Sequence, residues 1–183
     1  MCACHVWDTG DGMVAAGSDG EKATERKRFY MALLHIEKAG ALVLKEKCRP
    51  VDHVDGKLRK LLDDMLETMY EANGIGLAAP QIGQSLRMVV IDVGKGPLEL
   101  INPVITARSG SEVDSEGCLS VPEIFGDVER AAKVTVEYTN RFNKKRKLHA
   151  EKLLARCIQH ELDHLDGVLF IDIAQSLRQE KGG

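Results

Sequence analysis

The sequence predicts an α+β fold, in which an antiparallel or mixed sheet packs around a central helix. Two amphipathic helices, expected at residues 57–72 and 151–165, enclose a region of short Val- and Ile-rich segments. Strands that follow one another between two helices favour this class over the regular strand–helix alternation of a parallel sheet. The length of 183 residues is enough for one domain with a buried core.

The first thirty residues differ from the rest of the chain. They show little apolar periodicity, a charged run at 21–28, and breaks by small residues at Gly10, Gly12, Gly17, Ser18 and Gly20. Such composition is typical of segments that bury too little apolar surface to fold. We therefore predict that residues 1–30 form a poorly ordered N-terminal leader and that residues 31–183 form a single domain.

The first helix is indicated by apolar residues that recur every three or four positions. They are Leu58, Leu61, Leu62, Met65, Leu66 and Met69. Asp55 is placed to cap the start of this helix, and Asn73-Gly74 follows its end. The pattern predicts one buried helix face over residues 57–72.

The strands are indicated by β-branched residues and by alternation. Those expected are residues 87–93, 98–105, 133–139 and 146–149. Asn102-Pro103 interrupts the second strand, whereas the third alternates cleanly and places Val134, Val136 and Tyr138 on one face. Residues 140–145 are polar and predict the turn of a hairpin.

Composition disfavours several classes of protein. The net charge of −3 provides no overall basic field, so no specific DNA binding is expected. No apolar run reaches the length needed to span a bilayer, and the start lacks the order of a secretory signal. The five cysteines are odd in number and irregularly spaced, which argues against a disulfide framework. We expect a cytoplasmic protein without membrane contact and with at least one free thiol.

The strongest chemical signal is His160-Glu161-Leu162-Asp163-His164 on the second helix, which Asp166-Gly167 ends. Residues four apart share a helix face, so both imidazoles can reach one metal ion. Glu161 flanks the same space without being forced to ligate, which suits a general base acting on water. Two surface histidines are the alternative, but only six histidines occur in the chain. The motif predicts that the central helix binds a metal.

A catalytic metal usually has a third protein ligand and an open position. One class of metallopeptidase uses a histidine six residues after the motif's second histidine, where this chain has Phe170. Another class uses a downstream glutamate, and the only one left is Glu180 in the tail. The search therefore turns upstream, where Cys118 within Glu116-Gly117-Cys118-Leu119-Ser120 is the candidate. An inert buried cysteine is the alternative for this position.

Residues 74–81 read Gly-Ile-Gly-Leu-Ala-Ala-Pro-Gln and match the small-residue spacing of a dinucleotide-binding turn. That turn needs a strand before it and a helix after it, whereas here a helix precedes the segment and Pro80 follows. We interpret the segment as a stretch that lets a substrate backbone approach and that ends in an amide donor, Gln81.

Together the three motifs resemble one family, the peptide deformylases. Its Gly-x-Gly-x-Ala-Ala-x-Gln, Glu-Gly-Cys-x-Ser and Gln-His-Glu-x-Asp-His patterns occur in order at residues 74–81, 116–120 and 159–164. The resemblance runs from about Gly40 to Ile171, and Leu42 replaces the proline of many members at a peripheral turn. It implies that residues 31–183 are a catalytic domain that hydrolyses the N-formyl group of N-formylmethionyl peptides on newly made proteins, releasing formate.

The resemblance also implies a role for each matching residue. The metal ligands that it implies are Cys118, His160 and His164. The metal is typically Fe(II) in the family, with Zn, Ni or Co as substitutes, and a water completes the site. Glu161 is implied as the proton-transfer group, and the Gln81 side chain and the backbone N–H of Leu119 as donors to the oxyanion.

Substrate contacts follow from the same resemblance. A pocket for the methionine side chain is implied, lined by Ile75, Leu153 and Cys157, with the stem of Arg156 nearby. Gly76 is expected to pair its backbone with the substrate main chain. We also expect Arg130 to pair with Glu116 and hold the loop that carries Cys118.

The implied partner is the N-formylmethionyl nascent peptide. A transient contact with the ribosome is a hypothesis for the basic cluster at Arg141 and 144–147, for which a solvated turn is the simpler interpretation. Two other functions stay open: a general His-Glu-x-x-His metallopeptidase, which Phe170 disfavours, and an inactive metal-binding relative, which the presence of Glu161 and Gln81 disfavours.

Overall fold

The computed structural model describes residues 32–180, so the predicted leader at residues 1–30 lies outside the described part of the chain. Two α-helices are present in this part, α1 (Gly56–Glu71) and α2 (Lys152–Leu165), with three short 3-10 helices, η1 (Leu42–Lys45), η2 (Ala79–Ile82) and η3 (Phe170–Asp172). The strands are β1 (Gly76–Ala78), β2 (Met88–Ile91), β3 (Leu98–Ser109), β4 (Glu112–Cys118), β5 (Val121–Arg130), β6 (Lys133–Thr139), β7 (Lys145–Glu151) and β8 (Ser176–Gln179).

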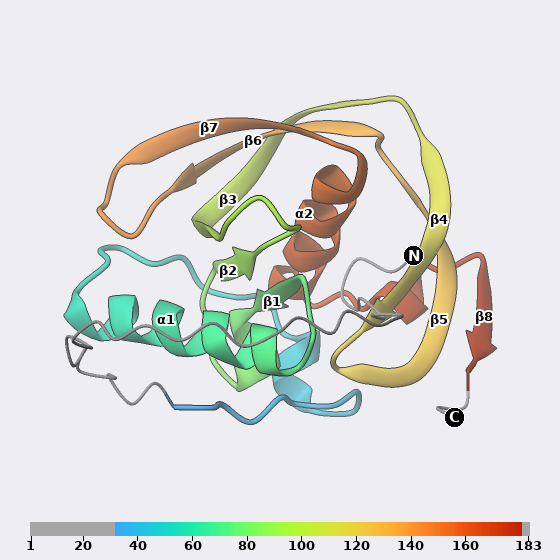
Figure 1. Ribbon diagram of the computed structural model, residues 1–183, viewed down its shortest axis with the longest axis horizontal. Helices are drawn as coiled ribbons and strands as arrows, with labels where there is room; N and C mark the ends of the chain where they lie inside the picture. The colour runs from blue at the N-terminus through green and yellow to red at the C-terminus, as the bar shows by residue number, and fades with distance from the viewer. Residues whose placement is uncertain (1–31, 181–183) are drawn as a thin grey trace, which may run out of the picture.

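The strands form two sheets whose neighbouring strands are all antiparallel. One sheet has the order β1-β2-β3-β6-β7 and the other the order β4-β5-β8. Figure 1 shows α2 in the middle of the molecule, with strands of both sheets around it. The predicted α+β class with a central helix is therefore confirmed.

The five-stranded sheet is covered on both faces, because alternate residues of β2 enter different apolar clusters. Val89 and Ile91 belong to the cluster that contains α2 residues, whereas Met88 and Val90 belong to the cluster that contains α1 residues. A strand between two helices is buried on both sides, which explains why β2 reads as an unbroken apolar run. This arrangement holds α2 at a fixed place against the sheet.

Helix α1 begins and ends within one residue of the predicted bounds. The Asp55 side chain accepts a hydrogen bond of 2.9 Å from the Leu58 N–H, and Asn73 adopts a left-handed φ of 53° after the helix. The buried face also contains two polar residues, Asp64 and Thr68, which the apolar pattern did not indicate. They accept hydrogen bonds of 3.0 Å from the N–H groups of Ala32 and Leu34, so they fix the start of the described chain along α1.

The strands differ from the prediction in two ways. Strand β3 continues to Ser109 instead of ending near residue 105, because residues 107–109 pair with residues 133–135 of β6. Asn102 takes a φ of 51°, and the register with β6 shifts between Ile101 and Val104. Strands β1, β4, β5 and β8 were not predicted, whereas β6 has the predicted bounds. No helix in residues 32–180 is long and apolar enough to cross a bilayer.

Candidate metal centre

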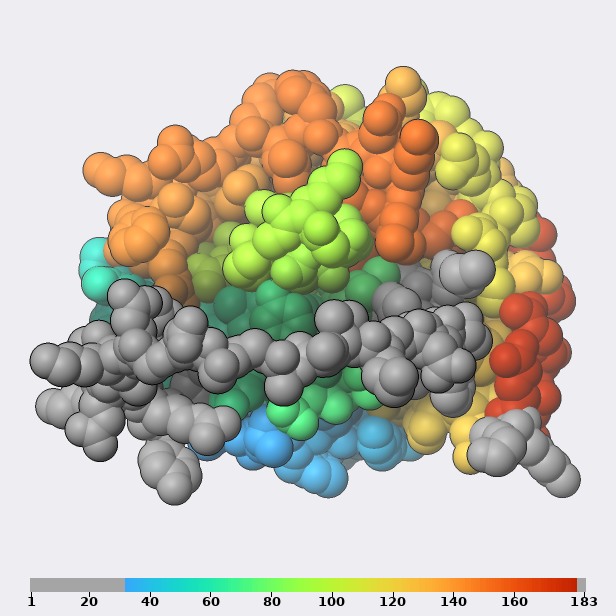
Figure 2. Space-filling view, in the orientation of Figure 1, coloured from blue at the N-terminus to red at the C-terminus, as the bar shows by residue number. Residues whose placement is uncertain are grey.

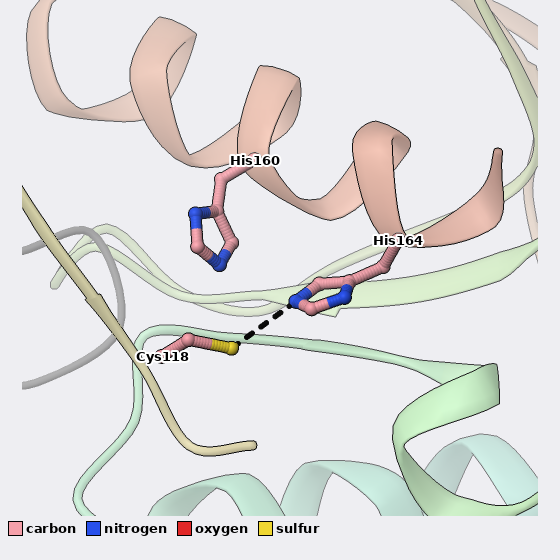
Figure 3. A group of neighbouring side chains, drawn as sticks. All are labelled: Cys118, His160 and His164. Atoms are coloured by element: carbon pink, nitrogen blue, oxygen red, sulfur yellow. Dashed lines mark hydrogen bonds between the residues drawn. The ribbon is translucent and has the colours of Figure 1, made fainter. Parts of the chain in front are cut away.

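Three side chains from two elements meet in the interior. One ligand atom from each of Cys118, His160 and His164 lies within 4.8 Å of the other two, and all three residues are buried. Figure 3 shows both imidazoles projecting from α2 toward the Cys118 thiol, and Sγ of Cys118 lies 3.2 Å from Nε2 of His164. The helix supplies the two histidines because residues four apart share a face, and β4 supplies the thiol from its last residue.

The chemistry of the donors fits a divalent transition metal. Nε2 of His160 is buried and has no hydrogen-bond partner among residues 32–180, which leaves its lone pair available for a ligand. Burial holds the pKa of His164 well below its ordinary value, so this imidazole is neutral as ligation requires. A thiolate and two neutral imidazoles are a common donor set for iron and zinc.

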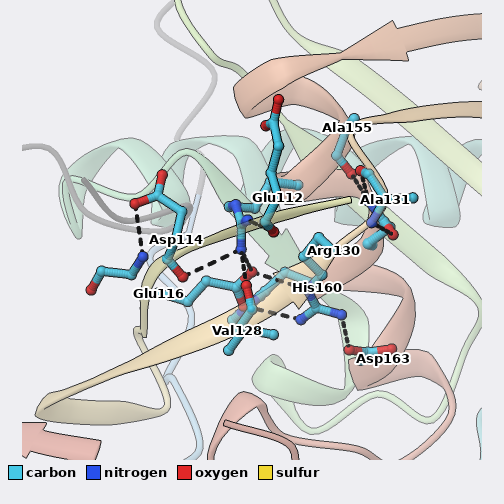
Figure 4. A network of polar contacts seen from close by, with 12 residues as sticks. Glu112, Asp114, Glu116, Val128, Arg130, Ala131, Ala155, His160 and Asp163 are labelled. Atoms are coloured by element: carbon cyan, nitrogen blue, oxygen red, sulfur yellow. Dashed lines mark hydrogen bonds and ion pairs between the residues drawn. The ribbon is translucent and has the colours of Figure 1, made fainter. Parts of the chain in front are cut away.

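The ring of His160 is fixed by a carboxylate that has no exposed surface. Nδ1 of His160 lies 2.9 Å from Oε2 of Glu116, and Arg130 donates to both oxygens of Glu116 at 3.0 Å (Figure 4). Burial alone raises the pKa of Glu116, but the hydrogen bonds from His160 and Arg130 outweigh it and hold that pKa well below the usual range. The ionised Glu116 therefore keeps the proton on Nδ1 of His160 and turns Nε2 toward Cys118. The expected pair of Arg130 with Glu116 is present, but the bond to His160 was not predicted.

Glu161 lies in a space that only a glycine can leave open. A Cβ atom at Gly76 would be 2.2 Å from Oε1 of Glu161 and 2.8 Å from Sγ of Cys157. Glu161 itself has no exposed surface. The glycine-rich segment of the sequence and the His-Glu-x-x-His helix are therefore in contact, with the Glu161 carboxylate between them.

Gln81 is held with its amide toward the same centre. Its Oε1 accepts a hydrogen bond of 2.8 Å from the Ala78 N–H, and its Nε2 donates to Oγ of Ser120 at 3.2 Å and to Sγ of Cys118 at 3.5 Å. These contacts orient the amide group as a donor. Ser120 was not singled out from the sequence, although it belongs to the same five-residue motif as Cys118.

The other residues predicted for the site lie at different depths. Leu119 is buried, and its carbonyl accepts a hydrogen bond of 2.8 Å from Nζ of Lys38, a contact that sequence reasoning missed. Ile75 and Cys157 are buried together, with Sγ of Cys157 donating to the Ile75 carbonyl at 3.6 Å. Leu153 is 38% exposed in the first turn of α2. The guanidinium of Arg156 binds Glu116 at 2.8 Å.

This arrangement defines a class of protein. Three nitrogen and sulfur donors converge, and a buried carboxylate and a side-chain amide flank them. These are the components of a metal-dependent hydrolase that acts on an amide.

Comparison with known proteins identifies the family. A family model described as polypeptide deformylase matches residues 33–180. A peptide deformylase of Desulfitobacterium hafniense is 57% identical over 145 residues, which cover 79% of this chain and 97% of that relative. A peptide deformylase of Pelotomaculum thermopropionicum is 52% identical over 149 residues, which cover 81% of this chain and 96% of the relative.

Solved structures agree with the sequence comparison. The crystal structure of a peptide deformylase from Thermotoga maritima has a TM-score of 0.78 and 44% identity, and the match covers 79% of this chain and 99% of that one. A peptide deformylase from Synechococcus elongatus in complex with actinonin has a TM-score of 0.76 and 41% identity, with coverage of 91% and 88%. The chain belongs to the polypeptide deformylase family. It is a hydrolase that removes the formyl group from formylated peptides.

Proposed function

We propose that the chain performs this hydrolysis at a metal held by Cys118, His160 and His164, with Glu161 as the proton-transfer group. The observation that carries the proposal is the meeting of three buried donors beside a buried carboxylate. We further propose Fe(II) as the native metal, because it is typical of the family, and we propose that Zn, Ni and Co can replace it, because one thiolate and two imidazoles bind all four. When bound, the metal supplies Lewis acidity that activates water and polarises the formyl oxygen.

The protein's own groups complete the reaction. Glu161 removes a proton from a water molecule as the water oxygen adds to the formyl carbon. Glu161 later passes that proton to the leaving nitrogen. The amide of Gln81 and the N–H of Leu119 donate to the oxygen that becomes negative, and one such donor typically contributes about 3 kcal/mol. The carbon–nitrogen bond then breaks, leaving formate and a free amino terminus.

The peptide is proposed to bind as an added strand. Strand β1 is an outer strand of the five-stranded sheet and β4 an outer strand of the three-stranded sheet, and each carries one part of the site. An extended peptide can hydrogen-bond to such an edge. Gly76 on β1 offers its backbone without a side chain in the way. The buried residues Ile75 and Cys157, with Leu153 at the helix start, are proposed to line the methionine pocket.

A basic surface at the hairpin of β6 and β7 supports a proposed transient contact with ribosomal RNA in the cytoplasm. Figure 2 shows this hairpin projecting at one end of the described surface. Arg141 is engaged by Asp63 and Glu99, and Lys147 by Glu137, but Lys144, Lys145 and Arg146 form no ion pair within residues 32–180. A 590 Å³ groove at the other end of β6 and β7 is lined by Lys95, Arg108 and Lys133, of which Lys133 pairs with Glu151. Unpaired cations on an acidic chain attract phosphate.

The experiment that tests the proposed function compares Glu161→Gln with Glu151→Gln. Glu161→Gln is expected to keep its metal and lose roughly a hundred- to ten-thousand-fold in formate release from a formyl-Met peptide, because glutamine cannot accept and return a proton. Glu151 is an exposed glutamate just before α2, so its variant is expected to behave like the wild type. Near-normal turnover in a fully metallated Glu161→Gln variant would contradict the role of Glu161. Cleavage of internal peptide bonds instead of formate release would favour a general metallopeptidase.

A further inference from the structure

Arg156 was expected only to place its stem near the methionine pocket, but its guanidinium makes several polar contacts with β4 and β5. It lies on α2, four residues before His160, and it is only 5% exposed. Its Nη1 donates to Oε1 of Glu116 at 2.8 Å and to the Val128 carbonyl at 2.9 Å, and its Nη2 donates to the Glu112 carbonyl at 2.8 Å. A longer contact of 3.5 Å reaches the Asp114 carbonyl. One guanidinium therefore connects α2 with both β4 and β5.

These contacts place Arg156 between α2 and β4, the two elements that carry the proposed metal ligands. The histidines come from α2, and Cys118 comes from β4, two residues after Glu116. Arg156 and His160 share a helix face and hold the same carboxylate from α2. The remaining bonds of Arg156 are to main-chain carbonyls of β4 and β5, so they restrain the paths of both strands and not only the Glu116 side chain.

The local charges show that a second arginine is not needed to neutralise Glu116. Arg130 already forms a two-pronged pair with Glu116 and also pairs with Asp163. Burying a further guanidinium has a large desolvation cost unless its donors are satisfied. Arg156 meets this condition through the planar array of its N–H groups, which a lysine cannot reproduce. A role in geometry explains the array better than charge balance does.

We propose that Arg156 is a positioning residue that holds β4 against α2, and thereby sets the spacing between Cys118 and the two histidines and the strength of metal binding. The inference rests on the metal centre proposed above. Partners that orient a ligand in this way commonly contribute about 10- to 100-fold to metal affinity. Because Glu116 keeps Arg130 when Arg156 is lost, the main effect is expected on the thiolate side of the centre.

The test uses Co(II)-substituted protein and three variants. Arg156→Met removes the donors but keeps a long side chain, and Arg156→Lys keeps the charge without the planar array. Arg178→Met is the matched control, because Arg178 also binds β4, through Oγ of Ser115 at 2.6 Å, but from the exposed side and without contact to Glu116. The readouts are Co(II) affinity by chelator competition and the thiolate-to-Co(II) charge-transfer band.

Arg156→Met is expected to bind Co(II) about 10- to 100-fold more weakly and to show a shifted charge-transfer band. Arg156→Lys is expected to recover part of the affinity, and Arg178→Met to match the wild type in both readouts. Wild-type affinity and an unshifted band in Arg156→Met, even with a lowered Tm, would overturn the inference. If Arg156→Met does not fold, wild-type values in Arg156→Lys overturn it equally. A wild-type chain without any thiolate band would instead refute the proposed metal centre.

Discussion

Gly76→Ala is expected to damage catalysis while leaving the metal in place. The added methyl carbon would lie 2.2 Å from Oε1 of Glu161 and 2.8 Å from its Cδ. Ordinary contact begins near 3.4 Å, so the carboxylate must move by at least about 1.2 Å. Sγ of Cys157 would also be close, at 2.8 Å, but the shortest contact is with the far end of the Glu161 side chain, so the added carbon displaces the proposed base more readily than it disrupts the backbone.

The size of the effect follows from the displacement. A misplacement of about 1 Å can cost roughly a hundred-fold in rate, and loss of a general base can cost up to about ten thousand-fold. These limits correspond to about 2.7 to 5.4 kcal/mol of activation free energy, since each tenfold is about 1.36 kcal/mol. We expect kcat to fall within this range. The contact involves none of the three residues proposed to hold the metal, so metal content should stay at the wild-type level.

The assay measures formate release from a formyl-Met peptide, with metal content determined on the same sample. Gly126→Ala is the matched control, because a Cβ there is also crowded, at 2.8 Å from Ala174, Leu177 and Ser176, but lies between β5 and β8. This control is expected to lose thermal stability and keep kcat per folded molecule. A Gly76→Ala enzyme with wild-type kcat would refute the reasoning, because Glu161 could then tolerate displacement from its position.

Three further results are expected. Cys118→Ala should lose both metal and turnover in elemental analysis and the formate assay, and a stoichiometric metal in that variant would exclude Cys118 as a ligand. Burial raises the pKa of Glu116, but its hydrogen bonds with His160 and Arg130 lower it by a larger amount. The pKa of Glu116 in the folded protein therefore lies below the usual 4.5. The stability that this lowered pKa contributes is present above about pH 4.5 and is lost as the pH falls below it. In urea unfolding of the metal-free protein, the free energy of unfolding should therefore fall less between pH 7 and pH 4 in Glu116→Gln than in the wild type. Equal decreases in the two proteins would contradict a lowered pKa of Glu116. Removal of residues 1–30 should leave turnover and Tm nearly unchanged, because the bonds of Ala32 and Leu34 to α1 remain, and a large drop in Tm would refute the proposed dispensable leader.

The helices and the two proposed histidine ligands could be predicted because their signals are local, whereas Cys118 was implied only by the resemblance to the family. Apolar spacing and Asp55 defined α1, and the spacing of His160 and His164 placed two donors on one face of α2. Strand β6 alternates because one face packs on the core, and its bounds were predicted without error. In each case the residues that carry the pattern are close in sequence.

The remaining parts depend on contacts between distant residues. Strand β4 reads Glu-Val-Asp-Ser-Glu-Gly-Cys and lacks apolar alternation, because Glu116 in its buried part is satisfied by residues of β5 and α2. Only the stem of Arg156 was expected near the site, and the contacts of its guanidinium with β4 and β5 were not predicted, although its position four residues before His160 indicated a shared face. The buried Asp64 and Thr68 of α1 likewise serve a segment more than thirty residues away.

The central claim is that Cys118, His160 and His164 hold one divalent metal on which formyl hydrolysis depends. The most direct measurement follows metal content and formate release together while the anaerobically purified chain is treated with a chelator and then reloaded with Fe(II). The account predicts that one metal per chain and the full rate are lost together and return together. Undiminished formate release from chain that contains no metal would contradict it.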